Sequence, residues 1–279
     1  MLSIKEQLLI LYCSIDDLLK QQPDAGKWRK SNNQPRFADS EVIVIALMQS
    51  YFRTDTLKQT YLLVKANDSR AFPHLPSYQQ WVARLHQLNR QIGGLMFYIP
   101  VALAELDGTY LMDSLPVAMC QPIPEGRVNL LRDEGAYYGK SSKGWFFGFK
   151  LHVLATRTGQ ILGAMMSQGN VDDRDGARIL AQLLEDEGLC MADLGYRGAV
   201  FQDEMYEEEV LFVTRADISE KQLKQIHSTV RERIETVFSE LWSRFATRVR
   251  SRSWLGLWNT LQLKMLDYKL CHAGLLPTN

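Results

Sequence analysis

Two aspartates follow short apolar stretches and stand at turns. Asp113 closes the stretch TYLMD, and Asp193 follows GLCMA and precedes a turn that contains Gly195 and Gly198. Apolar runs of this length, bounded by turn residues, predict buried strands. A carboxylate at the end of a strand can cap a turn, or it can bind a metal ion together with partner carboxylates. The second interpretation requires a fold that brings both aspartates to one edge of a sheet.

A long helix predicted over residues 219–246 offers a third carboxylate. Among Glu232, Glu235 and Glu240 we favour Glu235, because it stands at the edge of the apolar stripe of this helix. Glu232 falls near the same face and is the second choice. Arg231 lies four residues before Glu235 and could hold that carboxylate or contact a phosphate, although an ordinary exposed ion pair explains the same spacing. The stripe consists of Ile226, Val230, Ile234, Val237, Phe238, Leu241 and Phe245.

Three such carboxylates form a ligand set for divalent metal ions. Neighbouring carboxylates repel each other, and they stay ionised together when cations lie between them. Magnesium prefers a few carboxylates together with water and substrate phosphate. Two such ions roughly 3.5–4 Å apart can activate a nucleophile and stabilise the leaving oxygen at a phosphodiester.

The elements around the aspartates predict an α/β fold with a mixed sheet. Their order is three strands, then helix, strand, helix, strand and the long helix. This order matches the ribonuclease-H-like fold, in which the first strand lies beside the fourth and parallel to it, so that Asp113 and Asp193 would meet where such sheets bind ligands. The strands are expected at 109–113 with an extended continuation, 143–156, 159–167, 188–193 and 210–214, and the helices at 170–188, stopped by Gly188, and 199–208.

The first hundred residues predict several helices joined by turns. Residues 3–20 carry apolar side chains at spacings of three and four, and Asp39 or Ser40 could cap a strongly apolar helix that follows. Short helices of this kind can include a helix-turn-helix that contacts DNA. A plain helical bundle is an equally good interpretation of the same pattern.

We expect two domains, an all-helical N-terminal domain over 1–105, for DNA binding or dimerisation, and a ribonuclease-H-like domain over 106–279. The chain of 279 residues is 46% hydrophobic, which suits one large or two modest globular domains. The formal net charge is zero, but local fields still act on ligands because basic and acidic blocks alternate. Lys/Arg and Asp/Glu number 12 and 9 in residues 1–105, 6 and 2 in 127–157, 3 and 12 in 172–209, and 11 and 6 in 215–279.

The remaining composition predicts an intracellular protein without a membrane segment. The four cysteines are far apart, so no pair has the spacing of a metal or redox motif. The apolar run at residues 8–13 is too short to span a membrane and lacks the flanks of a signal peptide. A cytoplasmic, nucleoid-associated location follows if the partner is DNA.

Further residues are candidates for contact with DNA phosphate. Lys150 and His152 stand two apart on one predicted strand and so share a face, which could meet the aspartates or could be a solvated edge. Tyr196 and Arg197 follow Asp193 directly and could contact substrate, although turn chemistry also explains them. The run RFATRVRSRSW places Arg248, Arg250 and Arg252 at alternating positions, where phosphate contact and a solvated basic face are equal alternatives.

A cluster of aspartates, Asp172, Asp173 and Asp175, precedes the predicted helix at 170–188. Aspartates are favoured at the start of a helix because they cap its free amides and complement its dipole. A cap is therefore the first interpretation, although one of the three could reach the metal region.

Four stretches of the sequence together resemble one known family. LMDSLPVAM, GFKLHVLAT, MADLGYRG and RERIETVFSEL occur in the order found in the catalytic core of bacterial DDE insertion-sequence transposases, over roughly residues 106–265. In that family the acidic triad matches Asp113, Asp193 and Glu235, and an arginine four residues before the glutamate matches Arg231. The sequence departs from many relatives at Ser228 and Trp242, where they carry tyrosine and lysine, so hairpin chemistry is not implied.

The resemblance implies a DNA recombinase. Such a protein would bind the terminal inverted repeats of a mobile element, cut a strand to free a 3′ hydroxyl, and join that hydroxyl to target DNA. Two Mg²⁺ ions would be the working cofactor, with Mn²⁺ as a substitute, and a homodimer would hold the two ends. The alternatives are a metal-dependent nuclease of the same fold and a DNA-binding protein that has lost its activity.

Overall fold

The chain folds into two compact units. The computed structural model describes residues 4–23, 35–99, 106–120, 130–142, 144–184, 187–243 and 251–275. One unit, which we call the helical unit, comprises Met1–Pro100 and Leu241–Asn279, and the other, the sheet unit, comprises Val101–Glu240. No helix among the described residues is long and apolar enough to cross a membrane.

The sheet unit is built on a mixed sheet in the order β2-β3-β1-β5-β6, with β4 paired to β3. The pairing of β1 is antiparallel with β3 and parallel with β5, and β5 is parallel with β6. This is the strand arrangement expected for the ribonuclease-H-like fold, so the predicted fold class is confirmed. The strands are β1 (Thr109–Cys120), β2 (Tyr137–Ser141), β3 (Gly144–Thr156), β4 (Ile161–Gln168), β5 (Gly188–Ala192) and β6 (Val210–Thr214).

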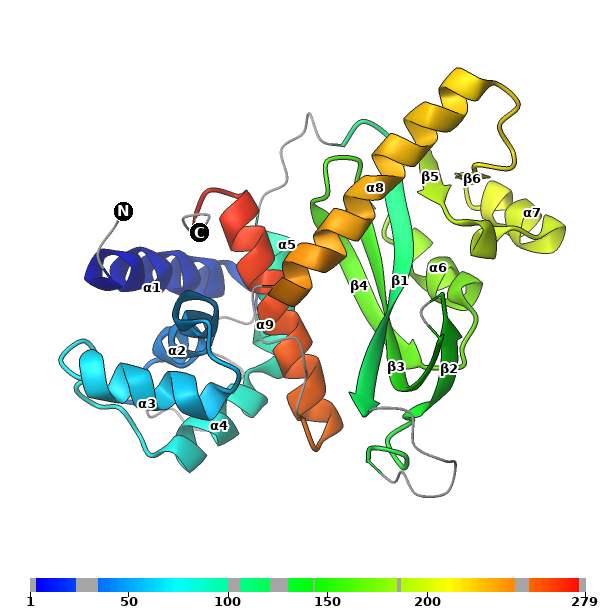
Figure 1. Ribbon diagram of the computed structural model, residues 1–279. Helices are drawn as coiled ribbons and strands as arrows, with labels where there is room; N and C mark the ends of the chain where they lie inside the picture. Colours follow the sequence, from blue (N-terminus) through cyan, green and yellow to red (C-terminus); the bar gives the residue numbers. More distant parts are fainter. Residues whose placement is uncertain are drawn as a thin grey trace. The chain divides into compact units, whose positions relative to one another are not determined.

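Helices cover both faces of this sheet (Figure 1). Because side chains alternate along a strand, Tyr110 and Met112 of β1 lie on one face, where they join the core formed with α6 (Asp173–Ala181) and α7 (Ala199–Glu207). Leu111 is fully buried and lies on the opposite face, as does Asp113. That second face is crossed by α8 (Lys221–Ser243), drawn in yellow and orange.

Polar contacts fix α8 to the sheet at two points. The His227 ring Nε2 lies 3.0 Å from the Val213 carbonyl oxygen of β6, and Arg233 Nε donates to the Thr158 carbonyl in the β3–β4 turn at 2.6 Å. Gly159 in that turn has φ +98°, and a Cβ there would lie 2.7 Å from Arg233 Nε, so both its backbone angle and its contact with α8 require glycine.

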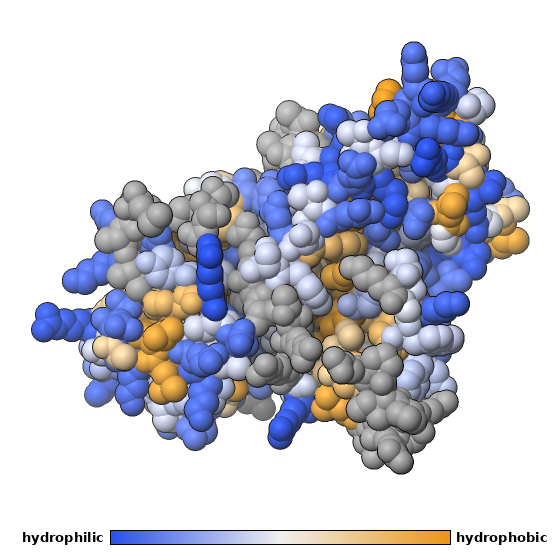
Figure 2. Space-filling model, in the orientation of Figure 1, coloured by the Kyte–Doolittle hydropathy of each residue, from blue (hydrophilic) through white to orange (hydrophobic). Residues whose placement is uncertain are grey.

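The apolar stripe of α8 is buried only over its second half. Ile234 and Val237 are fully buried, whereas Ile226 is 54% exposed. Figure 2 shows hydrophilic residues over the first half of the helix, at the upper right of the view. The predicted stripe is therefore correct near Glu235 and wrong at Ile226, because the side chain buried against the sheet at that end is His227.

The helical unit has a core of its own. The helices are α1 (Ile4–Gln21), α2 (Asp39–Phe52), α3 (Leu57–Asn67), α4 (Tyr78–Gln87), α5 (Asn89–Tyr98) and α9 (Trp254–His272). The predicted stripe of the first helix is buried at Leu8, Leu11, Ile15 and Leu18. In the same core lie Leu263, Leu266 and Leu270 of α9. The expected domain over 106–279 therefore differs from the observed unit at its C-terminal end, because the apolar side chains of α9 pack among the N-terminal helices.

Local boundaries differ from the expectations at several points. The N-cap of α2 is Ala38, whose N–H donates to the Glu41 carboxylate, instead of Asp39 or Ser40. Helix α6 ends at Ala181, and Gly188 does not stop it but begins β5, where it pairs with Val210. Strand β2 was not expected from the sequence.

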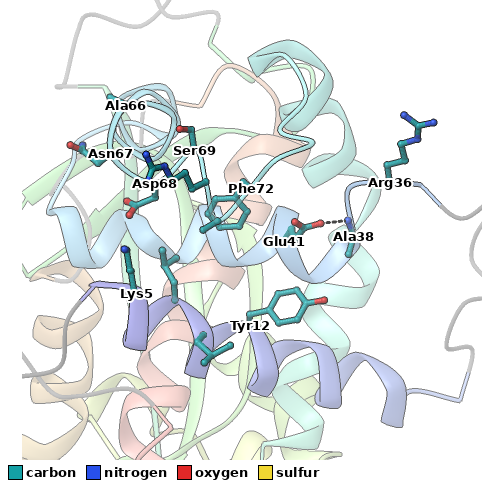
Figure 3. Close-up of a pocket in the computed structure, with 14 residues that line it drawn as sticks. Lys5, Tyr12, Arg36, Ala38, Glu41, Ala66, Asn67, Asp68, Ser69 and Phe72 are labelled. Carbon is teal, nitrogen blue, oxygen red and sulfur yellow. Dashed lines mark hydrogen bonds between the residues drawn. The ribbon is translucent and has the colours of Figure 1, made fainter.

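The helical unit also contains a pocket of about 910 Å³ (Figure 3). It lies between the first half of α1, which contributes Lys5 and Tyr12, and the segment after α3, which contributes Asp68 and Phe72. Asp68 is buried, and burial raises the pKa of its carboxyl group, an effect that the nearby Lys5 opposes. The pocket belongs to a different unit from Asp113 and Asp193.

Candidate active site

The register of the sheet brings Asp113 and Asp193 together. Parallel pairing matches Tyr110 with Cys190 and Leu111 with Met191. Continued for two more residues, this register puts Asp113 beside Asp193 on the face that α8 crosses. The strand expected over 109–113 and its extended continuation form one strand, β1, which runs to Cys120 along β3, so Asp113 lies within the strand and does not close it. The pairing of β1 with β5 ends at Leu111, two residues before Asp113. Both carboxylates therefore lie where the two parallel strands separate.

Each aspartate uses one oxygen for the local backbone and turns the other toward α8. Asp113 Oδ1 accepts from the Ser114 N–H at 2.8 Å, and Asp193 Oδ1 accepts from the Leu194 N–H at 2.7 Å. The second contact caps a short 3-10 helix, Leu194–Tyr196. Asp193 therefore caps a turn through Oδ1, as its sequence context suggests, and its Oδ2 takes no part in that cap.

Arg231 of α8 lies among the three predicted carboxylates. Its Nη2 is 3.1 Å from Asp113 Oδ2 and 3.7 Å from Asp193 Oδ2, and its Nη1 is 3.9 Å from Glu235 Oε1. The side chains of Arg231 and Asp113 are each 19% exposed, whereas those of Asp193 and Glu235 are 56% and 64% exposed. Three segments far apart in the sequence thus converge on one guanidinium group, with Asp113 at the buried end.

Burial raises the pKa of Asp113 from 3.8 to about 6. The Arg231 guanidinium and the Ser114 N–H oppose this shift, and the nearby Asp193 adds to it. The cost of removing the Asp113 carboxylate from water outweighs these favourable contacts. The positive charge around Asp113 therefore does not fully stabilise its ionised form. A perturbed carboxyl group with a charged partner at the carboxyl edge of parallel strands is typical of functional sites.

The donor set suits a divalent metal ion. Carboxylate oxygens are the ligands that Mg²⁺ prefers, and three of them already surround a positive group here. In the parts of the chain that the structure describes, no three acidic, histidine or cysteine side chains gather tightly enough to form a metal cluster. Arg231 takes the central position instead.

Lys150 and His152 lie on the other face of the sheet from Asp113. The Lys150 Nζ donates to the Asp173 carboxylate at 2.9 Å and to the Val171 carbonyl at 2.8 Å. His152 is buried, its Nε2 is 2.7 Å from Ser167 Oγ, and desolvation lowers its pKa to about 4. The structure therefore gives both residues internal partners and does not bring them to the three carboxylates.

The two predicted residues after Asp193 have different surroundings. Tyr196 is buried, its ring stacks on Phe212 with centroids 5.9 Å apart, and its hydroxyl group has no hydrogen-bond partner. Its side chain therefore belongs to the core beneath the carboxylates. Arg197 has a side chain that is 53% exposed, with Nε 3.3 Å from Asp217 Oδ1, so it is open to a ligand.

The basic run before α9 is described only in part. Arg248 and Arg250 lie outside the described residues, and Arg252 is exposed just before α9 in the helical unit. The sequence analysis missed the roles of Ser114 and Arg174. Ser114 donates to Asp173, and Arg174 donates to the Arg197 carbonyl. Alternation along β1 places Ser114 opposite Asp113, but its partner depends on where α6 packs.

Comparison with known proteins agrees with this geometry. A family model described as a transposase DDE domain matches residues 103–252, just over half of the chain, and covers Asp113, Asp193 and Glu235. No curated protein and no solved structure matches the chain significantly. Domains of this family generally use divalent metal ions and act on DNA. The chain therefore belongs to the transposase DDE domain family.

Proposed function

We propose that this transposase cuts DNA at the ends of a mobile element and joins the freed 3′ hydroxyl to target DNA, with Asp113, Asp193 and Glu235 as metal ligands. The observation that carries the proposal is the convergence of these carboxylates on Arg231, from β1, the end of β5 and α8. A structural ion pair needs one carboxylate for one guanidinium group. Three carboxylates around one cation leave negative charge that a further cation would balance.

Mg²⁺ would be held by the three carboxylates, and Mn²⁺ would replace it. When bound, such ions lower the pKa of an attacking water and stabilise the charge that develops on the leaving oxygen. Asp113, the most buried ligand, would fix the position of the metal, since its backbone is paired with Val153 of β3. Glu235, on α8, would complete the set from the exposed side.

Arg231 would keep the carboxylates together before the metal binds. Its guanidinium group offsets their mutual repulsion, and its Nε is buried without a hydrogen-bond partner. Metal binding would release part of this contact, which would leave a guanidinium group for a DNA phosphate. Arg197 stands on the loop that follows Asp193, and its exposed side chain would contact the DNA backbone on the same side.

The wider steps follow from the chemistry of joining two ends. Terminal inverted repeats would be the DNA that is bound, and a homodimer would hold one repeat in each subunit. Arg252 in the helical unit would contribute to phosphate contact, together with Arg248 and Arg250 of the same basic run. Such contacts carry most of the affinity for DNA without reading its sequence.

Cleavage and joining on a DNA that carries the element's own ends test the proposal. The wild type and Asp193→Asn would be compared with Mg²⁺ and with EDTA. We expect metal-dependent cutting and joining by the wild type and neither by the variant. Glu235→Gln should also lose both activities, whereas Glu232→Gln, an acidic residue of the same helix outside the cluster, should keep them.

The possible outcomes separate the proposal from its rivals. Cutting without joining would identify a metal-dependent nuclease. Binding to the ends without cutting would identify a DNA-binding protein that has lost its activity. Equal loss in Glu232→Gln and Glu235→Gln would contradict the assignment of the third ligand.

A further inference from the structure

The first turn of α6 contacts both segments that carry the aspartates. On the β1 side, Ser114 Oγ donates to Asp173 Oδ1 at 2.7 Å. On the β5 side, Arg174 Nη1 donates to the Arg197 carbonyl at 3.3 Å, in the loop that follows Asp193. Two neighbouring residues of one helix turn therefore contact strand β1 next to Asp113 and the loop that follows Asp193.

The contact with β1 rests on a half-buried ion pair between Lys150 and Asp173. Asp173 Oδ1 accepts from the Ser114 hydroxyl and also from Lys150 Nζ at 2.9 Å. The Lys150 side chain is 12% exposed and also donates to the Val171 carbonyl. A charged pair in such surroundings, with its remaining hydrogen bonds made, has a well-defined geometry. Because Ser114 follows Asp113 directly, this pair fixes the backbone from which the Asp113 carboxylate projects.

The contact with the Asp193 loop depends on Arg174, whose guanidinium group is fixed by Asp172. Arg174 Nε and Nη2 donate to the two oxygens of Asp172 at 2.9 and 2.7 Å. The hydrogen bond from Arg174 lowers the pKa of Asp172 to about 2. This paired donation leaves Nη1 directed at the Arg197 carbonyl. A Cβ at Gly198 would lie 2.9 Å from Nη1, so glycine there allows the loop to approach the guanidinium group.

The turn itself has little freedom to move. A Cβ at Gly176 would lie only 2.3 Å from His152 Nδ1, which shows that the helix backbone rests directly against a buried ring on β3. His152 is held in turn by Ser167 of β4. The turn is thus supported by the antiparallel strands while it contacts the two strands of the parallel pair.

We propose that residues 172–176 form a bracket that sets the separation of Asp113 and Asp193, with Asp173 and Arg174 as positioning residues. The inference rests on the proposed function, because the separation matters if the two carboxylates share metal ions. Groups that orient metal ligands in this way change metal affinity by about 10–100-fold when they are removed.

Metal affinity and backbone exchange in the full-length protein without DNA test the bracket. Ser114→Ala removes the link to β1, and Arg174→Ala removes the link to the Asp193 loop together with the pair that Arg174 forms with Asp172. Each should weaken Mn²⁺ binding, measured by calorimetry, by about tenfold or more. In the metal-free protein, hydrogen–deuterium exchange should rise at residues 112–116 in the first variant and at 194–198 in the second.

Further variants separate positioning from simple loss of folding. Asp173→Ala should weaken Mn²⁺ binding, and Asp173→Asn should restore most of it, because the amide keeps an oxygen that can accept from Ser114 and Lys150. Asp175→Ala is the matched control, since Asp175 lies in the same turn, its side chain pairs with Arg178, and it makes neither of the two linking contacts. The double variant Ser114→Ala/Arg174→Ala should weaken Mn²⁺ binding by less than the product of the two single losses. Each single variant already loosens the same separation, that between Asp113 and Asp193.

The results decide the bracket separately from the proposed function. Wild-type metal affinity and exchange in Ser114→Ala and Arg174→Ala, or an equal loss in Asp175→Ala, would overturn the bracket even if the wild type cuts DNA. Losses that multiply in the double variant would overturn it as well. A wild type that neither binds Mn²⁺ nor cuts would refute the proposed function, and the exchange data alone would then decide whether the turn links the two segments.

Discussion

Asp113 and Ser114 are neighbours on β1 and face opposite sides of the sheet, and each side holds a cation among carboxylates. On the α8 side, Arg231 lies 3.1–3.9 Å from three carboxylates. On the α6 side, Lys150 lies 2.9 Å from Asp173 and donates to a carbonyl at 2.8 Å. The two sites share strand β1 but differ in how far their charges are balanced.

This difference in charge balance distinguishes the α8 side, which can accept a ligand, from the α6 side, which stabilises the fold. Lys150 and Asp173 match one to one, and the half-buried ammonium group has short contacts with Asp173 and with a carbonyl oxygen. On the other side the carboxylates outnumber the cation, Arg231 Nε has no hydrogen-bond partner, and burial raises the pKa of Asp113 to about 6. Charge imbalance of this kind costs stability and is kept at functional sites.

The largest effect is expected from Asp113→Asn on catalysis. An amide cannot supply the negative charge that a metal ligand needs, so cleavage should fall by roughly a thousandfold or more. Strand cleavage with Mg²⁺ in excess measures this, and binding of the same DNA should persist. Cleavage within about tenfold of the wild type would show that the buried carboxylate is not a ligand.

Lys150→Met should have the next largest effect, and on stability. The substitution leaves Asp173 without its cation in a half-buried place, so the free energy of unfolding should fall by about 2–3 kcal/mol. Denaturant unfolding in EDTA measures the change. A free energy of unfolding equal to that of the wild type would mean that the Lys150–Asp173 pair on the α6 side does not stabilise the fold.

Asp113→Asn should have the opposite effect on the stability of the metal-free protein. The pKa of Asp113 is about 6 in the folded protein, above the ordinary aspartate value of 3.8 that applies to the unfolded chain. Ionisation of this group therefore destabilises the fold as the pH rises from about 4 to about 6. Removing the charge should raise the free energy of unfolding by about 1–3 kcal/mol at pH 7.5, and by nothing below about pH 4.

Thermal unfolding of both proteins in EDTA at several pH values checks this prediction. The difference between the variant and the wild type should grow through the window from about pH 4 to about pH 6 and stay constant above it. A difference that is independent of pH would trace the effect to packing instead of to the Asp113 charge.

The smallest effect is expected from Glu235→Gln on metal-free stability. The side chain is 64% exposed and lies 3.9 Å from Arg231, so the pair should contribute less than about 0.5 kcal/mol. Mg²⁺ should nevertheless raise the melting temperature of the wild type and not that of the variant. Equal stabilisation of both by Mg²⁺ would remove Glu235 from the ligand set.

Much of the sheet unit could be predicted from the sequence because its signals are local. Strand β6 is observed at the expected residues, the β3–β4 hairpin within a few residues, and Asp172 caps α6 through its side chain. Strand β2 was missed because YYGKS is short and has little apolar periodicity. The length of β1 was underestimated because its second half is held by β3, a partner 27 or more residues away in the chain.

The choice of three carboxylates could also be made from the sequence, although their role is still a prediction. Asp113 and Asp193 stand at strand positions, and Glu235 stands beside a stripe whose period is that of a helix. Spacing alone could not place Lys150 and His152, because alternation shows that they share a face but not which face. The pairing of β3 with β1 decides this, since His152 lies opposite Ser114 and not opposite Asp113.

The sequence by itself determined most of the strands, the helix that crosses them, the family, and the acidic residues that could bind metal, because each depends on residue types at short spacing. Only the tertiary structure decided which charges meet. Arg231 reaches Asp113 across 118 residues, Ser114 reaches Asp173 across 59, and α9 joins a core begun by α1. Such contacts depend on which face of each element is buried against which neighbour. Which faces are buried is decided by the mutual packing of all the elements and not by any one of them alone.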